Sequence, residues 1–76
     1  MALAYKKQNR LAEEDLFILA TIEKLQKDLQ NTHRALSQVT DPDLIDSFIY
    51  EMNALNMRYA VYLRMCKDKG LVSALF

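Results

Sequence analysis

The segment Thr40-Asp41-Pro42-Asp43 is the strongest break in this sequence of 76 residues, and it contains the only proline. A proline pushes the preceding residue out of the helical region and is itself well suited to the first position of a helix. Asp41 can cap the free N–H groups of that helix, and Asp43 lies in its first turn, where the helix dipole favours carboxylates. The segment therefore predicts that one helix ends and another begins here.

The second helix is predicted from about Pro42 to about Lys69. Arg64, Lys67 and Lys69 lie in its last turns, where cations suit the negative end of the helix dipole. Gly70 follows at the place where a left-handed residue commonly closes a helix. The sequence therefore marks both the start and the end of this helix.

The first helix is predicted from about Asn9 to about Val39, because residues 1–41 contain neither glycine nor proline. A turn at 40–41 then leads into the second helix. The apolar tail 70–76 follows at what we call the open end of the hairpin, where the first helix starts and the second stops. The whole chain is thus expected to form a single domain.

Both predicted helices carry a stripe of mostly apolar residues at alternating three- and four-residue steps. The first stripe consists of Ile18, Ile22, Leu25, Leu29, Thr32, Leu36 and Val39. The second consists of Ile45, Phe48, Met52, Leu55, Tyr59, Tyr62 and Cys66. The numbers of facing residues add up to twice that of Pro42, which indicates an all-α antiparallel hairpin of two long helices. The second helix offers other stripes as well, so this agreement supports the register without proving it.

Apolar residues remain on the outer faces of this hairpin. A second stripe on the second helix is turned away from the first one, and Phe17 lies in a segment of the first helix that is apolar nearly all round. Together they form a candidate interaction surface, which comprises Phe17, Tyr50, Ala54, Met57, Val61 and Met65.

A surplus apolar surface on so short a chain predicts a partner. A single seam between two helices buries little surface, and one cysteine cannot form an internal disulfide. We therefore expect a homodimer in which two hairpins form a four-helix bundle. Binding to a different protein is the alternative.

The charges are balanced, with 10 Lys+Arg against 10 Asp+Glu, and this argues against a general nucleic-acid-binding domain. Folding at Pro42 nevertheless separates the charges, with Asp41, Asp43 and Asp46 at the closed end. Basic residues gather at the open end, namely Lys6, Lys7, Arg10, Arg64, Lys67 and Lys69. Helix-dipole preferences explain much of this pattern. The alternative function is a nucleic-acid-associated accessory protein that uses the basic open end.

No residue pattern predicts catalysis, a cofactor or a bound metal. His33 is the only histidine and follows Gln30 where a di-metal bundle would need a glutamate. The run Glu13-Glu14-Asp15 points in different directions on a helix and suits the helix dipole. Cys66 is far in sequence from His33, so no activated nucleophile is expected. We expect a protein that is not an enzyme and has no small-molecule substrate.

The chain is also expected to be cytoplasmic and not to enter a membrane. Its first ten residues lack the apolar core of a secretory signal. The longest apolar run in the first half, Leu16 to Ala20, is far shorter than the roughly 18 residues of a membrane span. Cys66 is expected to be a small buried apolar residue, as is usual for a reduced thiol.

The segment Asp41-Pro42-Asp43-Leu44-Ile45-Asp46, followed by Ile49-Tyr50 and then by Arg58-Tyr59, Leu63 and a basic stretch, resembles the YaaL-like family of small bacterial proteins. The resemblance covers mainly residues 41–69. It implies a short, cytoplasmic, largely helical protein of uncharacterised function, and it supplies no catalytic or cofactor residues that could be carried over to this chain. The resemblance leads us to expect Ala and Glu before Arg58-Tyr59, but this chain has Leu55-Asn56-Met57, which makes that face more apolar.

Overall fold

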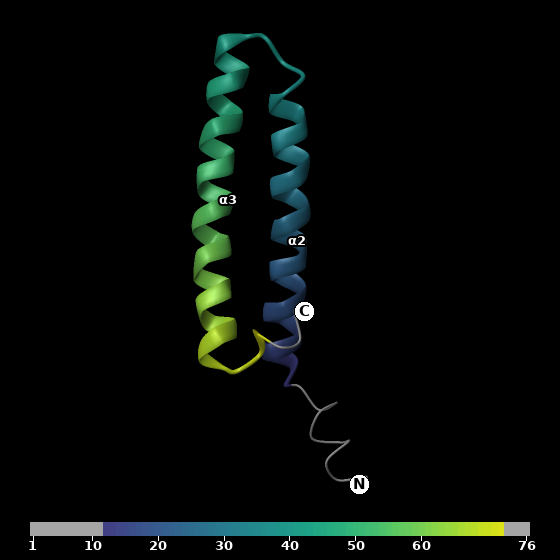
Figure 1. The fold of residues 1–76 in the computed structure, drawn as a ribbon, viewed down its shortest axis with the longest axis vertical. Helices are drawn as coiled ribbons and strands as arrows, with labels where there is room; N and C mark the ends of the chain where they lie inside the picture. Colours follow the sequence, from purple (N-terminus) through teal and green to yellow (C-terminus); the bar gives the residue numbers. More distant parts are fainter. Residues whose placement is uncertain (1–11, 73–76) are drawn as a thin grey trace, which may run out of the picture.

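Two long helices pack side by side and run in opposite directions (Figure 1). The computed structural model describes residues 12–72. Helix α2 comprises Glu13–Leu36, and helix α3 comprises Pro42–Asp68. The predicted all-α antiparallel hairpin is therefore confirmed. Neither α2 nor α3 holds a stretch apolar and long enough to cross a membrane.

The start of α3 is fixed by the side chain of Asp41. Its Oδ1 accepts hydrogen bonds from the N–H groups of Asp43 at 2.8 Å and Leu44 at 3.2 Å. Pro42 occupies the first helical position, where its missing N–H removes no helical hydrogen bond. The Asp-Pro pair therefore sets both the direction and the first turn of α3.

Helix α2 begins at Glu13, later than the expected start near Asn9; residues 9–11 lie outside the described residues. Ala12 is the N-cap residue and has extended backbone angles, but its side chain cannot cap the helix. The first turn instead carries three consecutive carboxylates, Glu13, Glu14 and Asp15, at the positive end of the helix dipole.

Helix α2 also ends earlier than expected, at Leu36 and not at Val39. The Ser37 hydroxyl donates a hydrogen bond to the Arg34 carbonyl at 2.7 Å, and the Gln38 N–H donates to the Ala35 carbonyl at 3.1 Å. Serine competes in this way with continued helical bonding, so the chain leaves the helix here. Val39 lies beyond the end of the helix but is still half-buried, as its place in the apolar stripe predicts.

The seam between the helices contains the residues predicted for it. Every member of the two stripes is buried or half-buried. The Gln26 side chain on α2 donates a hydrogen bond to the Tyr59 hydroxyl on α3 at 3.3 Å, consistent with a register centred on the turn. Toward the open end, Ile18, Ile22, Cys66 and Leu71 form a buried cluster.

At the open end of the hairpin, helix α3 ends in a Schellman motif. Gly70 has φ = 71°, the Gly70 N–H donates to the Lys67 carbonyl at 3.0 Å, and the Leu71 N–H donates to the Cys66 carbonyl at 2.8 Å. This turn buries Leu71 and packs the partly buried Val72 against the cluster. The rest of the predicted apolar tail, residues 73–76, lies outside the described residues.

Candidate functional site

The outer face of α3 carries large apolar side chains that the hairpin does not cover. Tyr50 is 74% exposed and Met57 is 70% exposed, while Val61 and Met65 are exposed to a smaller degree. Ala54 lies between them and is half-buried. Because these residues recur every three or four positions, they lie along one face over four turns of α3.

Phe17 extends this face onto α2 at the open end. Its ring lies at a steep angle to that of Tyr62 on α3, with ring centroids 6.3 Å apart and an interplanar angle of 62°. The Phe17 side chain is nevertheless 61% exposed. The structure thus brings Phe17 close to the Met65 end of the α3 stripe, although the two residues are far apart in sequence.

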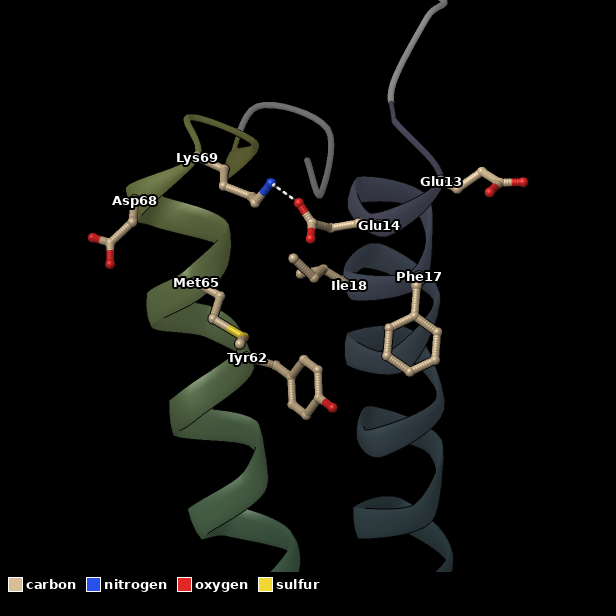
Figure 2. Close-up of a pocket in the computed structure, with 8 residues that line it drawn as sticks. All are labelled: Glu13, Glu14, Phe17, Ile18, Tyr62, Met65, Asp68 and Lys69. Atoms are coloured by element: carbon tan, nitrogen blue, oxygen red, sulfur yellow. Dashed lines mark hydrogen bonds and ion pairs between the residues drawn. The ribbon is translucent and has the colours of Figure 1, made fainter.

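A shallow groove of about 690 Å³ lies on the surface where the start of α2 meets the end of α3 (Figure 2). Phe17 and Ile18 from α2, and Tyr62 and Met65 from α3, supply its apolar lining. Its rim is charged and consists of Glu13, Glu14, Asp68 and Lys69. In Figure 2 the side chains of Glu13 and Asp68 point away from the groove, so its middle is apolar and open.

Lys69 links the two helices across one end of this groove. Its Nζ lies 2.6 Å from Oε1 of Glu14 and 2.9 Å from Oδ1 of Asp15. These hydrogen bonds, first to Glu14 and then to Asp15, raise the pKa of Lys69 above its usual value of 10.5. The positive charge of Lys69 is therefore compensated by carboxylates of the same chain.

Part of the positive charge at the open end is therefore neutralised within the chain. Arg64 and Lys67 are exposed, but Lys69 is engaged by two carboxylates. The bonds of Lys69 to Glu14 and Asp15 could not be predicted from the sequence, because helix dipoles already account for each of these charges separately. Lys6, Lys7 and Arg10 lie outside the described residues.

The residues considered for catalysis or metal binding lie apart. His33 is exposed on α2 and lines a second shallow groove with Gln30 and Met52. Cys66 has no exposed surface. Within residues 12–72, no group of three His, Cys, Asp or Glu side chains is placed to hold a metal ion.

The structure also exposes an apolar residue that no sequence stripe includes. Leu44, in the first turn of α3, is 49% exposed. Leu44, Glu51, Arg58 and Met65 follow one another at seven-residue steps and therefore lie along one flank of α3, beside the exposed stripe. This seven-residue spacing is the signal that could have identified Leu44.

Comparison with known proteins places the chain in a family without assigning it a role. A family model described as "Protein of unknown function (DUF2508)" matches residues 1–72. No curated protein and no solved structure matches the chain. The match covers both helices and the turn between them, so the chain belongs to the DUF2508 family of proteins of unknown function.

Proposed function

We propose that this chain is a protein-interaction module that acts through the candidate interaction surface, by binding and not by catalysis. The observation that carries the proposal is the exposure of Tyr50 and Met57, at 74% and 70%, on one face of α3. Contiguous apolar side chains on a small protein mark a surface that a partner covers. The groove beside Phe17 extends this surface across both helices.

The partner that we propose is a second copy of the chain. Few side chains of this hairpin are fully withdrawn from solvent, because two helices share only one seam. Packing two hairpins into a four-helix bundle would bury the α3 face of each, and twofold pairing is the commonest form of self-association. A different protein that offers an apolar helix is the alternative partner.

A nucleic-acid-associated role has less support. Arg64 and Lys67 are exposed, but the Lys69 ammonium is bonded to Glu14 and Asp15, so it offers a weaker attraction to phosphate. Such a role would appear as binding to single- or double-stranded DNA that weakens steeply with salt. The absence of binding at low salt would dismiss it.

The YaaL-like resemblance and the DUF2508 match concern the same part of the chain. We infer that YaaL-like proteins and DUF2508 are the same family, because the segment that carries the resemblance lies within residues 1–72 matched by the family model. The resemblance also leads us to propose a cytoplasmic location in a bacterium.

The mass of the protein in solution tests the proposal. Size-exclusion chromatography with light scattering should give a dimer at tens of micromolar, and Met57→Asp or Val61→Asp should give a helical monomer. Ile49→Asp is the matched control, because Ile49 is also exposed on α3 but lies off the stripe. A monomeric native chain, or equal disruption by Ile49→Asp, would refute the proposal.

A further inference from the structure

We propose that the α3 helices of two copies pack antiparallel, so that Leu44 of one copy covers the groove of the other. This inference rests on the proposed self-association. It adds the orientation of the two copies and the side chain that fills the groove lined by Phe17, Tyr62 and Met65. The order of apolar and charged residues along the exposed face of α3 supports this arrangement.

The exposed stripe is well suited to antiparallel pairing. Tyr50, Ala54, Met57 and Val61 alternate in steps of four, three and four residues, as the core positions of a coiled coil do. When two copies are centred between Ala54 and Met57, Tyr50 lies opposite Val61, and Ala54 lies opposite Met57. Each layer then combines a larger and a smaller side chain, which favours dense packing.

The charges beside the stripe favour the same orientation. Between residues 43 and 57, α3 has acidic residues but no Lys or Arg, whereas the cations lie from Arg58 onward. In the antiparallel register Glu51 lies near Arg58 of the second copy, and Asp46 lies near Lys67. Each pair occurs twice by symmetry. The four residues, Asp46, Glu51, Arg58 and Lys67, are exposed. Within residues 12–72 none of them forms an ion pair in the single chain.

The parallel orientation would place like charges together. In a parallel pair, a flanking residue lies near the opposite flank of the second helix about five positions away. Glu51 would then lie near Asp46 of the second copy, and two carboxylates in that arrangement repel each other. The same sequence therefore favours the antiparallel arrangement and disfavours the parallel one.

The antiparallel register also explains the exposure of Leu44. Leu44 and Met65 lie on the same flank of α3, and they are centred on nearly the same point as Tyr50 and Val61. Leu44 of one copy therefore lies opposite Met65 of the other, at the edge of the groove beside Phe17. Leu44 cannot reach the groove of its own chain, because it lies about 31 Å from Met65 along α3.

Disulfide cross-linking tests the orientation and the groove contact. Under diamide oxidation, a mixture of Tyr50→Cys and Val61→Cys chains should form the mixed disulfide, and neither variant alone should dimerise covalently. A mixture of Leu44→Cys and Met65→Cys should behave likewise. The native chain is the control, because Cys66 is buried and should not cross-link.

Charge reversal provides a second, independent readout. Glu51→Arg or Arg58→Glu should weaken the dimer about tenfold, and the double variant should return to within about threefold of the native chain. In a parallel dimer, Glu51→Arg would instead strengthen association, because the new arginine would lie near Asp46.

The results separate failure of the orientation from failure of self-association. A dimer in which Tyr50→Cys alone cross-links would overturn the antiparallel arrangement and leave the proposed function intact. A dimer in which the Leu44 and Met65 variants do not cross-link would overturn the groove contact. A chain that remains monomeric at tens of micromolar would overturn both the inference and self-association.

Discussion

Phe17 of α2 and Tyr62 of α3 meet at the open end of the hairpin, with ring centroids 6.3 Å apart, yet 61% of the Phe17 side chain faces solvent. Tyr62 is half-buried and belongs to the seam, whereas much of Phe17 lies outside it. Phe17 therefore contributes less to the hairpin than to the surface that the hairpin presents.

Phe17→Ala should therefore weaken association more than folding. We expect the hairpin to lose about 1 kcal/mol of its free energy of unfolding, because an aromatic pair of this kind is worth about 0.5–1.5 kcal/mol. The dissociation constant should rise about tenfold or more. Urea unfolding and sedimentation equilibrium measure the two effects. Leu16→Ala is the control, since Leu16 is exposed but does not line the groove, and equal effects of both variants would contradict this role.

Ile22→Ala should strongly destabilise the hairpin. Ile22 has no exposed surface and belongs to the buried cluster, so its truncation leaves a cavity that costs about 2–5 kcal/mol. Urea unfolding, followed by the far-ultraviolet circular dichroism of the helices, measures this loss. Ile49→Ala, at an exposed site on α3, should change stability by less than about 1 kcal/mol. Similar losses in the two variants would mean that the seam does not hold the helices together.

Asp41→Ala should remove the N-cap of α3 and reduce the free energy of unfolding by about 1 kcal/mol, within a usual range of about 0.5–2 kcal/mol. Asp41→Asn is the matched control, because its side-chain oxygen can still accept hydrogen bonds from the N–H groups of Asp43 and Leu44. Thermal unfolding of the three proteins measures the difference. If asparagine is as harmful as alanine, the carboxylate acts through its charge and not as a cap.

The contribution of Lys69 to stability should disappear at high pH. Hydrogen bonds to Glu14 and Asp15 raise its pKa above 10.5, so the folded state holds this proton more tightly than the unfolded state. The contribution is therefore fully present below pH 10.5 and is lost as the pH rises through the higher folded value. Lys69→Met should remove this part of the pH dependence, whereas Lys67→Met should retain it. The free energy of unfolding of the native chain and of both variants should be measured from about pH 8 to about pH 12, the range around the lysine pKa. The same pH dependence in all three proteins would contradict this role of Lys69.

The register of the hairpin could be predicted because it depends on residues at fixed steps around one proline. The end of α2 could not, because Val39 continues the apolar pattern while the hydroxyl of Ser37 closes the helix locally. Periodicity reports which side a residue faces. It does not report whether the backbone is still helical there.

The candidate site was only partly predictable for a related reason. Tyr50 and Met57 could be assigned to an outer face from spacing alone, and the structure places them on exposed parts of α3. The bonds from Lys69 to Glu14 and Asp15 join residues more than fifty positions apart, and helix dipoles already account for each charge. Leu44 belongs to neither apolar stripe, and only its seven-residue spacing from Glu51, Arg58 and Met65 links it to the exposed side of α3.

Because Cys66 is buried, the reactivity of its thiol reports motions that separate the two helices at the open end. Its sulfur is the only thiol and has no exposed surface, so a thiol reagent reacts with it only when the helix ends separate. The labelling rate of the unmodified protein therefore measures how often the two helices part near Ile18. A bound partner that clamps these ends would slow that rate, without any dye or tag having been introduced.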